Sequence, residues 1–117
     1  MAIDLTFANL EAALPPGSVV DDVATNDIKI SLKALMGEAA VDFADPKVSE
    51  AISKLLDGCA KAQTAFNAAS ATDLNSYPAP TPGIPTQDAD GNWYASFTHS
   101  VTVNIPLNRN ETSGVVL

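Results

Sequence analysis

The two side chains best suited to acid–base or nucleophilic chemistry are His99 and Cys59, each the only one of its type in the chain. Histidine often acts as a general acid or base because its pKa lies near neutrality. Nucleophilic catalysis also needs an orienting group, and no Ser, Cys or Asp stands at a spacing that forms a recognisable triad with His99. We therefore predict that His99 is a core or interface residue and that Cys59 is a small buried apolar one.

A second candidate for chemistry is a short run of oxygen-bearing side chains. Asp88, Asp90 and Asn92 stand at positions one, three and five of a calcium-loop spacing. That pattern requires Gly at the sixth position and Glu at the twelfth, where this chain has Trp93 and His99. A hairpin turn explains the same residues, so the sequence predicts no metal site, no cofactor and no catalytic residue.

The segment after this turn has the clearest pattern in the chain. Residues 93–107 alternate between an apolar face and a largely polar one, which is typical of a β-strand with one buried side. The apolar face consists of Trp93, Ala95, Phe97, His99, Val101, Val103, Ile105 and Leu107. The opposite face carries a neutral ladder of Thr98, Ser100, Thr102 and Asn104, which is either solvated or a repeated contact surface.

The first half of the chain has helical patterning instead. Residues 6–14 form a predicted helix, with Thr6 or Asp4 as its cap and Pro15-Pro16-Gly17 after its end. A second helix is predicted from Ile28 to Met36, with Asn26-Asp27 at its start and Gly37 at its end. A strand through Ile28, Ile30 and Leu32 is the competing interpretation, and it accounts for fewer residues.

The strongest helical pattern covers residues 46–70. Asp45 is the predicted N-cap and Pro46 the first helical residue, where its missing N–H costs nothing. Gly58 inside this helix either permits close approach of another backbone or is merely tolerated. The predicted apolar stripe is Val48, Ile52, Leu55, Leu56, Cys59, Ala62 and Phe66, and we expect Leu55 and Phe66 to be buried.

A proline-rich connector separates the two patterns. Residues 72–91 contain Pro78, Pro80, Pro82 and Pro85, which exclude a helix and favour extended chain. The turn at residues 88–92 could join a short strand around residues 83–87 to the long strand. The apolar tail at residues 115–117 could fold back as another short strand.

Charge and hydropathy exclude several classes of function. The net charge is −8, and no Lys or Arg lies between Lys61 and Arg109, which argues against binding to nucleic acid or to an anionic membrane surface. The N-terminus lacks a signal-peptide pattern, and no apolar run reaches the ~18 residues of a membrane span. We expect a soluble, cytoplasmic protein.

These patterns predict a single α+β domain over residues 1–117: about three N-terminal helices in residues 1–71, a connector over residues 72–91, and a β segment over residues 92–117. The helices should pack on a small C-terminal antiparallel hairpin or sheet. We expect a non-enzymatic structural or interaction protein that forms a homo-oligomer through its β segment. A small ligand-binding or regulatory domain, with a pocket near Trp93, Tyr94 and His99, is the alternative. The expected interface residues are Trp93, Phe97, His99, Val101, Val103 and Ile105.

Overall fold

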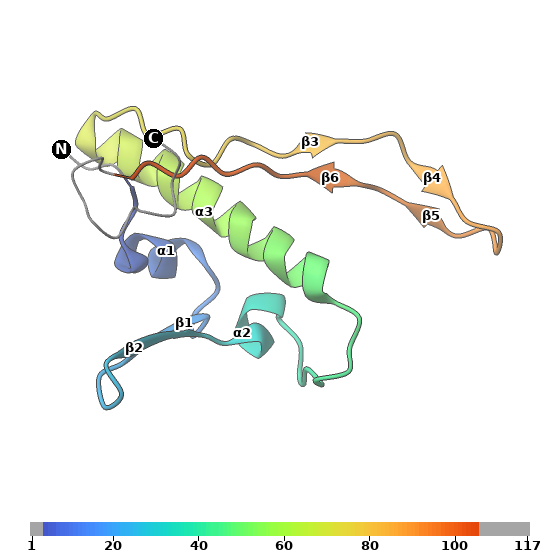
Figure 1. Ribbon diagram of the computed structural model, residues 1–117, viewed down its shortest axis with the longest axis horizontal. Coiled ribbons are helices and arrows are strands. Elements are labelled where there is room, and N and C mark those ends of the chain that lie inside the picture. Colours follow the sequence, from blue (N-terminus) through green and yellow to red (C-terminus); the bar gives the residue numbers. More distant parts are fainter. Residues whose placement is uncertain (1–3, 106–117) are drawn as a thin grey trace.

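Three helices and six strands occupy the part of the chain that the computed structural model describes, residues 4–105 (Figure 1). In chain order they are α1 Phe7–Ala13, β1 Val19–Asp22, β2 Asp27–Ile30, α2 Leu32–Met36, α3 Val48–Ser70, β3 Thr81–Pro82, β4 Thr86–Gln87, β5 Trp93–Tyr94 and β6 Phe97–Thr98. All three helices precede β3–β6, and the described strands pair only in antiparallel two-stranded units. The predicted α+β class is therefore confirmed.

The first helix forms where the sequence predicts it. Thr6 is its N-cap: the Thr6 hydroxyl accepts a hydrogen bond from the Asn9 N–H, and the Asn9 side chain accepts one from the Thr6 N–H. This reciprocal pair satisfies two N–H groups that lack partners within the helix. Leu14 ends the helix in extended conformation, directly before Pro15.

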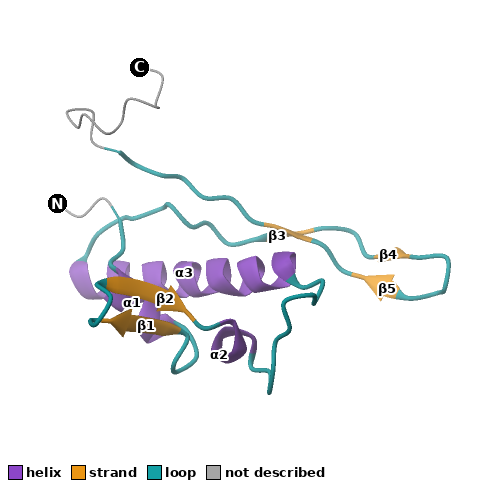
Figure 2. Cartoon of the chain, turned by 60° about the horizontal axis from the view of Figure 1, so that its bottom comes forward, coloured by secondary structure: helices purple, strands orange, loops and turns teal. Residues whose placement is uncertain are grey.

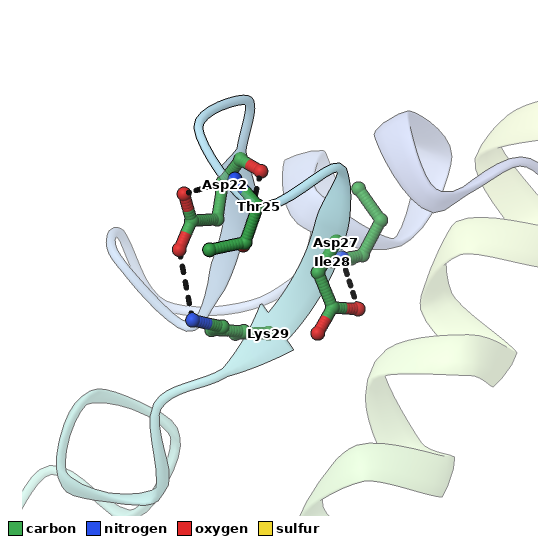
Figure 3. A network of polar contacts seen from close by, with 5 residues as sticks. All are labelled: Asp22, Thr25, Asp27, Ile28 and Lys29. Carbon is green, nitrogen blue, oxygen red and sulfur yellow. Dashed lines mark hydrogen bonds and ion pairs between the residues drawn. The ribbon is translucent and has the colours of Figure 1, made fainter.

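The prediction of a helix beginning near Asn26-Asp27 is wrong, because these residues belong to a β-hairpin. β1 and β2 pair antiparallel, with Val19 opposite Ile30. Asn26 takes a left-handed conformation, φ 54°, which Asn tolerates better than most residues. Polar contacts close the hairpin (Figure 3): Lys29 Nζ lies 2.8 Å from Asp22 Oδ2, and the Thr25 N–H donates to the same Asp22 carboxylate. The Lys29 hydrogen bond is the main reason that the pKa of Asp22 is lowered.

Only the end of the predicted second helix is helical. α2 begins after Ser31, whose hydroxyl accepts a hydrogen bond from the Ala34 N–H, and it ends at Gly37 with φ 66° as predicted. Leu35 and Met36 are buried. The helical spacing of the apolar residues therefore came from a strand residue, Ile28, followed by a short helix.

The long helix α3 begins two residues later than predicted. Lys47 occupies the N-cap position without a side-chain cap, and Asp45 instead accepts a hydrogen bond from the Asp42 N–H in the preceding loop. The buried residues of α3 are small ones, Ala51, Gly58, Cys59 and Ala62. A Cβ at Gly58 would overlap the side chain of Leu14, so this glycine permits close approach of α1 and α3.

The core lies where α1, β1 and α2 meet α3. Leu14, Val19 and Leu35 are buried there, and Leu10 and Leu55 pack against them partly exposed. Leu55 and Phe66 are thus less buried than predicted, because the small side chains of α3 face the other elements. Ser18 is fully buried beside this core, and its hydroxyl has no hydrogen-bond partner among the described residues.

Residues 80–98 form a ribbon that leaves this body; we call it the β-arm. Figures 1 and 2 show it running past the N-terminal end of α3 into solvent. The radius of gyration is 17.1 Å and the longest extent 53 Å, whereas a compact domain of this length would have a radius of gyration of about 13 Å. Residues 99–105, the return segment, run back along the body. The predicted roles of Leu107 and the 115–117 tail lie outside the described residues.

Candidate self-association interface

The tip of the β-arm is organised by one carboxylate. The Asp88 side chain accepts hydrogen bonds from the backbone N–H groups of Asp90 and Asn92, each at 2.9 Å, and from the Tyr94 hydroxyl at 3.0 Å. The Asn92 backbone hydrogen bond is the main reason that the pKa of Asp88 is lowered. Gly91, with φ 86°, supplies the left-handed residue of the turn. The predicted hairpin turn is confirmed.

The predicted uninterrupted strand over residues 93–107 is wrong in length. Among the described residues it contains only β5 and β6, which pair with β4 and β3. Thr86 lies opposite Tyr94 and Pro82 opposite Phe97, so residues 83–85 face only residues 95–96. This mismatch is a β-bulge, and it interrupts the ladder.

The bulge contains a proline, which helps to explain why the ladder is interrupted there. Pro85 lies between the two paired segments and has no N–H to donate to the second strand. The alternation in residues 93–107 correctly indicated extended chain. The region predicted as a connector supplies the paired strands β3 and β4, and β4 lies within the short strand expected around residues 83–87.

The apolar face of the β-arm is not covered by the helices as expected. Trp93 is 67% exposed and Phe97 58% exposed, and Ile84 on the opposite strand is exposed as well. Of the other predicted interface residues, Val101, Val103 and Ile105 are exposed in the return segment and His99 is half-buried. All six predicted residues are thus at least partly accessible, and they share one extended segment.

Two hydrogen bonds fasten the return segment to the body. His99 Nε2 lies 2.8 Å from the Ser53 hydroxyl on α3, and the Thr102 N–H donates to the Ser76 carbonyl oxygen at 2.9 Å. The structure thereby brings a serine to the histidine that the sequence left without a partner. The two residues are 46 positions apart, and no local spacing could have indicated their contact.

The Ser53–His99 contact resembles the nucleophile and base of a catalytic triad. Acyl transfer would also need a group that orients the second imidazole nitrogen and donors for an oxyanion. Within residues 4–105 no hydrogen bond reaches His99 Nδ1, and Ser53 lies inside α3, where helix bonding uses the backbone N–H groups. The contact fits an anchor that holds the return segment, and with it the base of the β-arm, on α3.

A pocket of about 310 Å³ opens beside this anchor, between α3 and the base of the β-arm. His99 and Phe97 line it from the arm, and Glu50, Lys54 and Asp57 line it from the helix. The alternative expectation of a pocket between the long helix and the sheet therefore has a counterpart. Trp93 and Tyr94, however, lie farther along the arm and do not line it.

Sequence analysis missed an apolar groove of about 770 Å³ where α2, the loop at residues 39–45 and the start of α3 meet. Phe43 and Val48 line it and are exposed. The local signal was the group of apolar side chains Ala39, Ala40, Val41 and Phe43 around Asp42, which the sequence suggested only as a continuation of the second helix. Lys47 also lines the groove and forms an ion pair with Glu38, 2.8 Å, and this hydrogen bond raises the pKa of Lys47.

Other candidate groups are placed away from the arm. Cys59 is buried in α3, as predicted, and burial is the main cause that raises the pKa of its thiol. In residues 4–105 no three His, Cys, Asp or Glu side chains are grouped closely enough to hold a metal ion. None of the described helices is long and apolar enough to cross a membrane. Comparison of the chain with protein families, with curated proteins and with solved structures finds no match.

Proposed function

We propose that this is a non-enzymatic structural or interaction protein that self-associates through its C-terminal β segment. The observation that carries the proposal is the β-arm: a ribbon that projects from the body with Trp93 and Phe97 largely in solvent. Large aromatic side chains dominate the energetics of protein interfaces, and their exposure on a monomer is costly. A second protein surface would remove this apolar area from water.

Backbone chemistry supports the same proposal. A two-stranded ribbon is at best marginally stable alone in water, and the paired segments of this one are each two residues long. Its outer edge along β5 and β6 carries N–H and C=O groups that another strand can pair with. Adding strands from a second chain, as in β-augmentation, would complete these hydrogen bonds and widen the sheet.

The direct test is the mass of the full chain in solution over a wide concentration range, by analytical ultracentrifugation. We expect a defined oligomer whose population rises with protein concentration. Replacing both Trp93 and Phe97 by Ser should give a monomer with unchanged helix content by circular dichroism. A wild-type chain that stays monomeric at millimolar concentration would contradict the proposal.

The pocket beside His99 supports a second candidate, a small ligand-binding or regulatory domain. It combines an aromatic wall from Phe97 with charged groups from Glu50, Lys54 and Asp57. Because His99 is the only histidine, its ring resonances report on this pocket without overlap. A screen of small organic fragments that shifts these resonances, with loss of the shift in a Phe97→Ala variant, would favour this function.

A further inference from the structure

The hydrogen bonds of the β-arm show which edge of its second strand, residues 92–98, is free. The Gly83 N–H donates to the Ser96 carbonyl oxygen at 2.7 Å, and the Asp88 N–H donates to that of Asn92 at 2.9 Å. The backbone N–H and C=O groups of the even-numbered residues of this strand therefore face the first strand of the ribbon, residues 81–88. Because successive residues of a strand direct their backbone groups to opposite edges, the N–H and C=O groups of Trp93, Ala95 and Phe97 face outward.

The Thr102 contact continues this alternation into the return segment. Its N–H is directed toward Ser76, again from an even-numbered position. Odd-numbered positions thus have both their apolar side chains on one face and their backbone groups on the outer edge. Within the described residues, no backbone hydrogen bond engages the N–H groups of Trp93, Ala95 or Phe97.

The opposite edge of the ribbon is closed by prolines. Since the Gly83 N–H points inward, the neighbouring position 82 and then position 80 point outward, and both are proline. An incoming strand finds no donors there, which is a common protection of sheet edges. Head-to-tail pairing of one edge with the other is therefore disfavoured.

The free edge is complementary to itself. When two copies pair antiparallel with Ala95 opposite Ala95, Trp93 of each lies opposite Phe97 of the other. Aromatic cross-strand pairs of this kind stabilise antiparallel sheets, and a small central residue leaves room for both. Residues 91–105 contain no Asp, Glu, Lys or Arg, so two chains of net charge −8 meet here without charge repulsion between strands.

We infer that the protein forms a closed twofold dimer by antiparallel pairing of the 93–97 edges, centred on Ala95. This inference rests on the proposed self-association and adds its partner, a second copy, and its register. The product is a four-stranded sheet whose two outer strands both carry prolines. Such a sheet does not extend into a filament, because an isologous contact closes on itself.

Disulfide trapping in the full chain tests the register. Opposed hydrogen-bonded residues have Cα atoms about 5.5 Å apart, within the range that a disulfide spans. In a Cys59→Ser background, Ala95→Cys should cross-link efficiently under mild oxidation. The matched controls Val101→Cys and Ile84→Cys are also exposed, and they should not cross-link, because each would lie far from its counterpart.

A proline variant gives an independent measurement. Ala95→Pro removes the central N–H of each copy and should weaken dimerisation by about tenfold or more. Fluorescence of Trp93, the only tryptophan, should shift to shorter wavelength as the wild type dimerises, and this shift should move to higher concentration in the variant.

The possible results separate the inference from the function beneath it. Cross-linking at Ile84 or Val101 instead of Ala95 would overturn this register but not self-association. A dimer affinity that Ala95→Pro leaves unchanged would do the same. Growth of the wild type into filaments would overturn the closed dimer. A wild type that is monomeric by mass at every concentration would overturn the proposed function as well.

Discussion

The body buries its core side chains, whereas the β-arm leaves its largest ones in solvent. Leu35 in the body is 4% exposed, and Trp93 in the arm is 67% exposed. The body packs α1 and α2 against α3 and β1 against α1, while the chain leading from the arm is joined to α3 by the Ser53–His99 hydrogen bond. Under the proposed self-association, the two regions depend on different sources of stability: contacts within the chain for the body, and contacts between chains for the arm.

The largest effect should come from the body. Leu35→Ala removes most of a buried side chain and should lower the free energy of unfolding by about 2–5 kcal/mol, as measured by urea denaturation of the monomeric Trp93→Ser variant. Val48→Ala, at a 72% exposed position of α3, is the control and should change stability by less than about 0.5 kcal/mol. Equal losses at both positions would show that the core is elsewhere.

Substitutions in the arm should change self-association and leave the stability of the body unchanged. Trp93→Ser should weaken self-association by about 2 kcal/mol or more, the level of an interface hot spot, and leave the unfolding of the body unchanged. Ile84→Ser, on the proline-bearing strand, is the matched control and should leave the dimer intact. A loss of helix content in Trp93→Ser would mean that the arm stabilises the body after all.

Gly58 sharpens the comparison because it lies where the body is packed most closely. Gly58→Ala forces a methyl group into Leu14, and overpacking of this kind costs about 1–3 kcal/mol. Helix propensity returns up to about 1 kcal/mol of that cost. We expect a net decrease of about 1–2 kcal/mol in the free energy of unfolding, without a change in dimer affinity. A stabilised variant would contradict the close approach of α1 and α3.

The sequence was sufficient for features that depend on local chemistry. It predicted the α+β class, the first helix, the C-terminal Gly37 of α2, the burial of Cys59 and the Asp88 turn, each determined by nearby residues. Helical spacing misled at residues 28–36, because an apolar strand residue happened to precede a short helix at the same period. The strand length was wrong because pairing depends on the partner, and the partner strand has a bulge at residues 83–85.

The candidate interface also combines residues that the sequence predicts locally with a contact that it could not predict. Alternation identified the apolar residues of the extended segment but not what covers them, since a one-sided pattern is the same whether a helix or another chain lies against it. The Ser53–His99 contact joins residues 46 positions apart and depends on the path of the whole chain. No spacing rule reaches that far.

A smaller effect is expected at Ser18. Its fully buried hydroxyl has no partner among the described residues, and an unsatisfied buried polar group costs about 1–3 kcal/mol. Ser18→Ala should therefore raise the free energy of unfolding by about 1 kcal/mol. The Ser18 backbone bonds to Pro15 and Ser31 remain available in the variant. A destabilised variant would show that the hydroxyl is bonded in solution.

The smallest effect concerns alkaline pH. Burial, followed by the nearby Asp4 charge, raises the pKa of Tyr77 to about 12. A folded-state pKa above the unfolded value of 10.0 means that the contribution of Tyr77 is complete below pH 10 and is lost between pH 10 and about pH 12. Unfolding of the wild type should become easier over that interval more steeply than that of Tyr77→Phe. Parallel pH profiles would contradict this assignment.

The β4–β5 pair and then the β3–β6 pair follow the Asp88 turn outward, and this order affects how fast the ribbon can form. Every strand pair in the ribbon is connected through the same five-residue loop, so pairing can begin at the tip and proceed toward the body before α3 has formed. Hairpins form in about 1–10 μs, far faster than two proteins meet at micromolar concentration with an association rate constant of about 10⁵–10⁷ M⁻¹s⁻¹. Assembly should therefore follow second-order kinetics, with a rate proportional to the square of the monomer concentration and no lag for ordering the arm.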